Sequence, residues 1–183
     1  MIAKPGSCFL RCLIFFFVIV IFSDVLESTC FARPQEEDVT QIILPVTAAA
    51  IALARYDNEG FLQLSKGFAS SITVTYALKY TVDRDRPDGS PHTFPSGHTA
   101  SAFSAAAFLQ KRYGWMYGLP AYSAAIFTGY GRVENGAHRT EDVLVGALLG
   151  IVGQLIFTTP YTDIKVVPLV GRTVAGIVAT IEW

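Results

Sequence analysis

Charged side chains are scarce in this sequence, and neither sign is in excess. Lysine, arginine, aspartate and glutamate make up 16% of the 183 residues, and the formal net charge is −1. Proteins that bind nucleic acid need a basic surface to meet the phosphate backbone, so this class of partner is excluded. The hydrophobic fraction is 51% and the mean hydropathy is +0.41, values that indicate a protein in a membrane or at its surface.

Cysteine is absent after residue 30. All three cysteines lie near the N-terminus, at Cys8, Cys12 and Cys30. The rest of the chain therefore cannot form an internal disulfide, even in an oxidising compartment. Its stability must come from packing.

The N-terminal segment has the pattern of an export signal. Lys4 and Arg11 precede the apolar run CLIFFFVIVIF, and small residues follow at Cys30 and Ala32. This pattern is typical of a secretory signal peptide cleaved near Ala32, with an uncleaved anchor as the alternative. We expect residues 1–32 to be one or the other. The rest would then be exported to the cell envelope, as a periplasmic or membrane-associated protein.

The rest of the chain divides into a linker, a helical domain and a short tail. Residues 33–41 are polar and predict a linker, residues 42–160 a compact all-α bundle of about five helices, and residues 161–183 a C-terminal β-hairpin. The expected helices are Ile42–Arg55, Phe61–Tyr80, His98–Arg112, Leu119–Tyr130 and Asp142–Phe157.

Only two parts of the predicted bundle are uncharged over the length of a membrane span. They are residues 143–162 and the more polar residues 113–131, and a spanning helix needs about 20 apolar residues. A bundle on the membrane surface and one thinly embedded in it both remain open.

The stretch FPSGHTASAF places a small polar turn directly before an apolar helix. Gly97 lets the backbone approach a ligand closely, and the first turn of the helix offers free N–H groups and a positive dipole end. Ser96 adds a hydroxyl donor, and His98 lies at the rim. Taken alone, these residues also suit an ordinary helix start.

Further polar residues recur at fixed intervals on either side of this turn. Upstream, KYTVDRDRP sets Lys79 seven residues before Arg86; downstream, GRVENGAHRTED contains Arg132, His138 and Asp142. At an i, i+4 spacing the carboxylate could hold the imidazole N–H and fix its orientation. Two guanidinium groups and an ammonium would neutralise a phosphate dianion.

Together the three blocks resemble the signature of the type 2 phosphatidate phosphatase and vanadium haloperoxidase superfamily. The matching residues are Lys79, Arg86, Pro87, Pro95, Ser96, Gly97, His98, Arg132, His138 and Asp142. The resemblance implies an all-α fold and a phosphatase that needs no metal or other cofactor. It also implies that His138 forms a phosphohistidine, Asp142 supports it, and His98 is the general acid and base. The phosphate would be held by Lys79, Arg86, Ser96, Gly97 and Arg132.

The sequence departs from the family pattern at two points. Gly131 stands where the family has serine, which removes one donor to the phosphate, and only seven residues separate Pro87 from Pro95. The apolar, exported chain favours a lipid phosphate or pyrophosphate at a membrane surface, with the site on the extracytoplasmic side. The alternatives are a soluble phosphomonoester substrate, a haloperoxidase with bound vanadate, and a non-enzymatic envelope protein.

Overall fold

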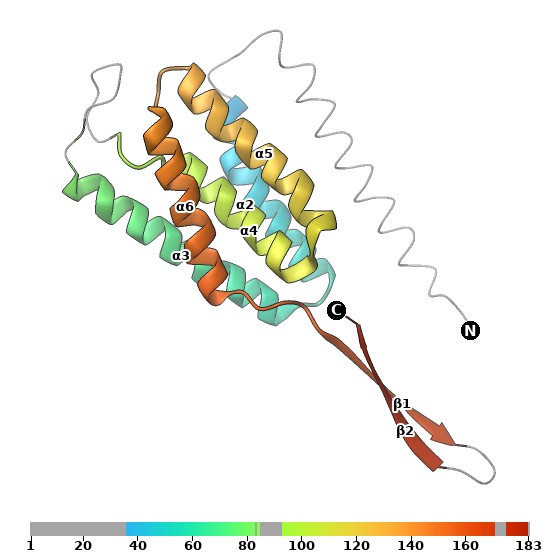
Figure 1. The fold of residues 1–183 in the computed structure, drawn as a ribbon. Coiled ribbons are helices and arrows are strands. Elements are labelled where there is room, and N and C mark those ends of the chain that lie inside the picture. Colours follow the sequence, from blue (N-terminus) through green and yellow to red (C-terminus); the bar gives the residue numbers. More distant parts are fainter. Residues whose placement is uncertain (1–35, 83, 85–92, 171–174, 183) are drawn as a thin grey trace. The chain divides into compact units, whose positions relative to one another are not determined.

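The computed structural model describes residues 36–82, 84, 93–170 and 175–182. The expected leader, residues 1–32, lies outside the described residues, as do Arg86 and the short loop that follows it. Five helices are described: α2 (Glu36–Ala54), α3 (Asn58–Thr81), α4 (Gly97–Tyr113), α5 (Trp115–Glu134) and α6 (Thr140–Phe157) (Figure 1). The last described elements are two antiparallel strands, β1 (Asp163–Val170) and β2 (Ala175–Glu182), with Asp163 opposite Glu182.

The helices follow the expected order, but all five begin earlier than the sequence predicted, and the differences are largest for α2 and α5. α2 starts at Glu36, inside the stretch that we interpreted as a linker. Acidic residues are favourable at a helix start because they face the positive end of the dipole, so a polar composition alone did not distinguish a linker from a first turn. α5 starts at Trp115, immediately after Gly114, whose φ of 87° allows the tight turn out of α4.

Helix α4 is the centre of the bundle. It packs against α3, α5 and α6, and the Ser101 hydroxyl also donates a hydrogen bond to the Gln41 carbonyl of α2 (2.8 Å). Its buried positions are mostly alanine and serine, with Phe108 as the largest buried side chain. Small side chains let the surrounding helices approach closely, so the alanine-rich sequence after the PSGH turn explains the central place of α4.

Helix α6 meets its neighbours through glycine. A Cβ atom at Gly146 would collide with the Ser96 carbonyl, one at Gly150 with the Ala100 carbonyl, and one at Gly153 with the Ser71 hydroxyl. Each of these glycines is buried. The backbone of α6 therefore lies directly against the backbone at the start of α4, and against the small Ser71 side chain of α3.

The outer surface of the bundle is apolar. On α6, Leu144 and Ile156 are 63% and 70% exposed, and Leu148, Val152 and Leu155 are also exposed. Of the helices that the structure describes, α6 alone is long and apolar enough to cross a membrane. Small residues inside and large apolar residues outside are the arrangement that helices adopt in lipid.

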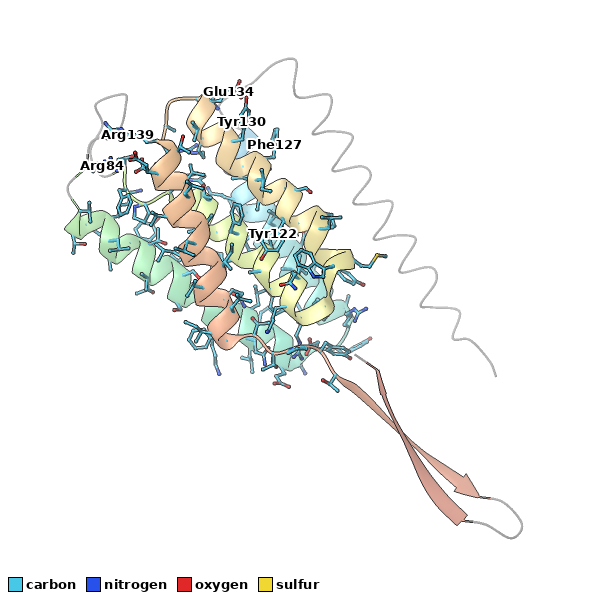
Figure 2. The ribbon with its side chains drawn as sticks, viewed as in Figure 1. Arg84, Tyr122, Phe127, Tyr130, Glu134 and Arg139 are labelled. Atoms are coloured by element: carbon cyan, nitrogen blue, oxygen red, sulfur yellow. The ribbon has the colours of Figure 1, made fainter. Side chains whose placement is uncertain are left out.

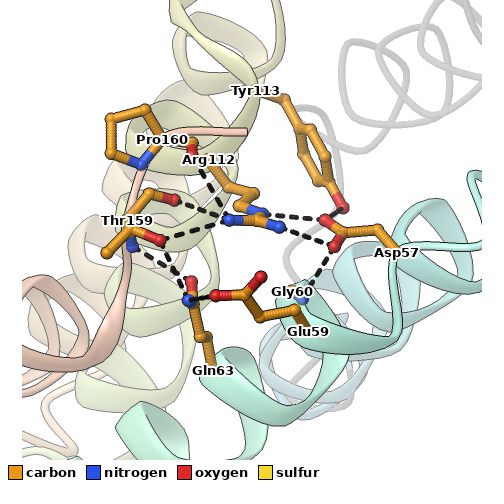
Figure 3. Close-up of polar contacts among 8 residues, drawn as sticks. All are labelled: Asp57, Glu59, Gly60, Gln63, Arg112, Tyr113, Thr159 and Pro160. Carbon is orange, nitrogen blue, oxygen red and sulfur yellow. Dashed lines mark hydrogen bonds and ion pairs between the residues drawn. The ribbon is translucent and has the colours of Figure 1, made fainter. Parts of the chain in front are cut away.

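A buried ion pair fastens the end of the bundle where α4 finishes (Figure 3). The Arg112 guanidinium donates two hydrogen bonds to the Asp57 carboxylate (2.7 and 2.6 Å) and one to the Thr159 carbonyl (3.0 Å). Asp57 also accepts from the Gly60 N–H and the Tyr113 hydroxyl, both at 2.8 Å. Burial opposes ionisation of Asp57, but these hydrogen bonds outweigh it and hold the pKa of the carboxyl below its usual value. The clamp joins the α2–α3 turn, α4 and the segment after α6.

Candidate active site

The residues of the three sequence blocks gather at the other end of α4. Two helices finish at this end, with Lys79 in the last turn of α3 and Arg132 in the last turn of α5. Two helices start here: Ser96 is the N-cap of α4, and Asp142 lies in the first turn of α6. In Figure 2 the labelled residues of these termini, including Arg139 and Glu134, lie at this end. The N–H groups at the start of α4, together with the cations Lys79 and Arg132, favour an anion here.

The PSGH turn and the start of α6 are joined through the backbone. The Ser96 N–H donates to the Asp142 carbonyl (3.0 Å), and Gly146, one turn further along α6, lies against the Ser96 carbonyl. The backbones of Ser96 and of the first turns of α6, nearly fifty positions apart in the sequence, are thus in direct contact. This contact brings the second and third sequence blocks to one place.

We expect Gly146→Ala to disturb the site from outside it. The added methyl group would force α6 away from Ser96, and overpacking of this kind typically costs about 1–3 kcal/mol of stability. Displacement of a catalytic group by about 1 Å can cost roughly 100-fold in rate, so kcat/KM should fall together with the melting temperature. Leu148→Ala, on the exposed face of the same helix, is the matched control. Full activity in Gly146→Ala would show that this contact does not position the site.

His138 and Asp142 come together, as the sequence predicted, but not on one helical face. His138 precedes α6. Its backbone N–H donates to the Arg132 carbonyl (3.0 Å) and closes the turn between α5 and α6. The His138 Nδ1 lies 3.8 Å from the Asp142 Oδ2, and both side chains are fully buried. This separation is too long for the direct hydrogen bond that the i, i+4 spacing suggested.

Ser96 is more constrained than the sequence suggested. Its hydroxyl lies within hydrogen-bond distance of the Thr99 hydroxyl (3.0 Å) and the Thr99 N–H (3.5 Å), and the residue is fully buried. Its N–H is already bound to the Asp142 carbonyl. In this geometry Ser96 shapes the turn, and the exposed part of the first helical turn is formed by Gly97 and His98, which are both half-buried.

The two described cations, Lys79 and Arg132, are more exposed to solvent than the buried pair of His138 and Asp142. Lys79 and Arg132 are half-buried at their helix ends, and the Lys79 ammonium lies 5.8 Å from the centre of the Tyr76 ring. Arg86 falls outside the described residues, so its expected role in binding phosphate stays a prediction. Among the residues that the structure describes, no group of three or more His, Cys, Asp or Glu side chains is arranged to hold a metal ion.

Two residues of the site were missed in the sequence. The Thr93 hydroxyl is buried and lies 3.1 Å from the His138 Nδ1 and 2.9 Å from the Asp142 Oδ2. Arg84 forms an ion pair with Glu141 (2.8 Å) and lies 3.6 Å from the Asp142 Oδ1. No role in the site was predicted for Arg84 from the sequence. Nothing in the spacing distinguishes Thr93, because its hydroxyl reaches His138 and Asp142 only in the folded loop, where its backbone N–H donates to the Arg84 carbonyl (2.8 Å).

A comparison with family models decides what kind of protein this is. The model of the PAP2 superfamily matches residues 60–164, more than half of the chain. The chain belongs to the PAP2 superfamily. The matched region contains α4 to α6, all of α3 except its first two residues, and every residue of the three blocks, and it ends just after β1 begins. The match therefore gives no support to the predicted C-terminal β-hairpin.

Two curated relatives of this PAP2 protein are named as lipid A phosphatases. The chain is 31% identical over 151 residues to the lipid A 4'-phosphatase of Helicobacter pylori strain J99, and the match covers 76% of each chain. A segment of 95 residues is 46% identical to the lipid A 1-phosphatase of Porphyromonas gingivalis, covering 49% of this chain and 21% of that protein. The chain is accordingly an enzyme, a PAP2-type phosphoric ester hydrolase.

Solved structures share the helical fold of this PAP2 protein. The crystal structure of Aquifex aeolicus LpxE superposes with a TM-score of 0.54 at 24% identity, over 69% of this chain and 87% of that one. The PAP2-type phosphatidylglycerolphosphate phosphatase of Bacillus subtilis also gives a TM-score of 0.54 at 24% identity, over 85% of this chain and 94% of that one. The expected all-α PAP2 fold is confirmed.

Proposed function

We propose that this PAP2 phosphatase removes a phosphate group from a membrane lipid through a phosphohistidine on His138. The observation that supports this most directly is the buried pair of His138 and Asp142. The backbone holds this pair against the start of α4, at the bundle end that also carries Lys79 and Arg132. The proposed nucleophile, its proposed supporting carboxylate and two cations that would bind the phosphate therefore lie at the same end of the bundle.

The first chemical step would form a bond between His138 and phosphorus. The unprotonated imidazole nitrogen attacks in line with the leaving oxygen, the P–O bond to the alcohol breaks, and His98 gives its proton to the leaving alkoxide. In the second step neutral His98 takes a proton from water, the hydroxide oxygen attacks phosphorus, and the P–N bond breaks. Asp142 stabilises the positive charge on His138 while the intermediate exists.

The phosphate oxygens would be held by Lys79, Arg86, Arg132 and the N–H of Gly97. Charge builds on these oxygens in the transition state, so fixed cations and N–H donors around them lower the barrier. Ser96 would contribute by fixing the turn, since its own N–H is occupied by Asp142. No metal ion or cofactor enters either step.

A lipid substrate fits the exterior of the bundle better than a soluble one. The surface of α6 below the site is lined with exposed leucine, isoleucine and valine, which would keep the enzyme in or on the bilayer. The relatives named above carry lipid A, a phosphorylated lipid, in their names. We therefore place the protein in the cell envelope, with the site at the extracytoplasmic surface.

We expect the purified enzyme to prefer phosphate presented at a lipid surface. Phosphate release should be measured on lipid monophosphates and lipid pyrophosphates in mixed vesicles, beside a small aryl phosphate in the same buffer. Binding energy from the lipid can be used in the transition state, so kcat/KM should be higher for a lipid by about 100-fold, or about 2.7 kcal/mol. Vanadate should inhibit the reaction. Equal or better hydrolysis of the aryl phosphate would favour the soluble-substrate alternative, and halide oxidation with vanadate would favour the haloperoxidase.

A further inference from the structure

A third side chain lies between the proposed nucleophile and its carboxylate. The His138 Nδ1 and the Asp142 Oδ2 are 3.8 Å apart, too far for a hydrogen bond. The Thr93 Oγ1 is 3.1 Å from the first atom and 2.9 Å from the second. All three residues are at most 2% exposed. The contact between imidazole and carboxylate thus runs through the Thr93 hydroxyl.

Counting protons assigns a direction to this chain of hydrogen bonds. A threonine hydroxyl has one proton to donate, and an ionised carboxylate can only accept. The Asp142 Oδ2 already accepts from the Arg139 N–H (2.9 Å) and takes the Thr93 proton as its second donor. The Thr93 oxygen therefore presents a lone pair to His138. For a hydrogen bond to form between them, the His138 Nδ1 must be protonated and act as the donor.

The opposite assignment leaves an unfavourable contact. If Thr93 gave its proton to the His138 Nδ1, its oxygen and the Asp142 Oδ2 would face each other at 2.9 Å with no proton between them. Two buried oxygens with only lone pairs in contact repel, and the Asp142 Oδ2 would keep only the Arg139 N–H as a donor. The Nδ1–H form of His138 removes this conflict and leaves Nε2 with its lone pair.

We propose that Thr93 is a positioning residue that connects Asp142 to His138 and fixes the tautomer in which Nε2 is the attacking atom. This inference rests on the proposed function, in which His138 is the nucleophile. Thr93 would not touch the substrate. It would act through His138, holding the ring angle and passing the influence of the carboxylate to it.

The backbone holds Thr93 firmly enough for such a role. Its N–H donates to the Arg84 carbonyl (2.8 Å), so the start and end of the loop between α3 and α4 are tied together at this residue. Two residues later the chain enters the buried Pro95–Ser96 turn, where the Ser96 N–H is bound to the Asp142 carbonyl. The Thr93 hydroxyl and the Asp142 carboxylate are thus carried by segments that are bonded to each other.

The kinetic test compares Thr93→Val with Thr93→Ser. Valine has nearly the shape of threonine but no hydroxyl, whereas serine keeps the hydroxyl and loses only a methyl group. We expect kcat to fall about 10–100-fold in Thr93→Val, the usual effect of removing the outer partner of a functional imidazole. KM should stay within about twofold because phosphate contacts are unchanged, and Thr93→Ser should recover most of kcat. Near-normal kcat in Thr93→Val, or equal losses in both variants, would overturn the proposal.

A direct measurement keeps the test independent of how well the valine variant folds. The imidazole nitrogens of the unmodified enzyme can be labelled with ¹⁵N, and the His138 signals assigned by their absence in His138→Ala. We expect neutral His138 to carry its proton on Nδ1; a proton on Nε2 would overturn the proposal. Phosphate release that survives in His138→Ala would instead contradict the proposed function, so the two failures are distinguishable.

Discussion

Replacing His138 with alanine is expected to abolish phosphate release, with kcat falling about 10⁴–10⁶-fold, the range seen when a catalytic nucleophile is removed. His138 is 2% exposed and lies beside the fully buried carboxylate of Asp142. The surrounding side chains therefore hold its ring in one orientation. Phosphate release from a lipid phosphate, with a colorimetric assay for inorganic phosphate, measures the effect. No other residue of the described site has the geometry of an activated nucleophile, so little activity should remain.

A control variant separates this loss from a general disturbance of the bundle end. Glu134→Gln changes an exposed side chain at the end of α5, near the same face, and should keep kcat within about twofold because surface substitutions are usually small in effect. The melting temperature of His138→Ala should be compared with that of the unmodified enzyme. A folded His138→Ala enzyme with substantial turnover would exclude the phosphohistidine route.

Replacing His98 with alanine is expected to cost about 10²–10⁴-fold in kcat on a lipid phosphate, the usual contribution of general acid–base catalysis. A lipid alkoxide is a poor leaving group and needs the proton that His98 would supply. His98 lies in the first turn of α4 and is half-buried, as expected for a group that meets both substrate and water. KM should change little, because the phosphate would be held by other residues.

The leaving group provides the decisive comparison for His98. A nitrophenyl phosphate releases a stable phenolate that needs no proton, so the formation of the phosphoenzyme should be far less affected in His98→Ala. The second step still needs a base, and the variant should therefore show a burst of phenolate followed by slow turnover. An equal loss on both substrates with no burst would contradict the assignment of His98 as acid and base.

The helices were predictable because their sequence patterns are local. Apolar residues at three- and four-residue spacing set most helix boundaries close to where they lie, as do breaks such as Asp57 before α3 and the glycine after Tyr113. The early start of α2 was missed because the acidic run before Ile42 suits both a linker and a first helical turn. The depth of the bundle in a membrane depends on the outward face of each helix, which spacing alone does not give.

The site was predictable in its members but not in its connections. Fixed spacing identified His138, Asp142 and the PSGH turn, since these residues lie in recognisable blocks. The bond from Ser96 to the Asp142 carbonyl, and the place of Thr93 between imidazole and carboxylate, depend on how α4 packs against α6. Such contacts arise only from the folded backbone, where Gly146 permits the close approach.

The central claim, a phosphate transferred to His138, can be tested by isolating the intermediate. His98→Ala should be mixed with nitrophenyl phosphate, quenched at alkaline pH, where phosphohistidine is stable, digested, and analysed by mass spectrometry. We predict a phosphorylated peptide with the modification on His138, and none in the double variant that also carries His138→Ala. A phosphate found on another residue, or a burst of phenolate with His138 unmodified, would contradict the proposed mechanism.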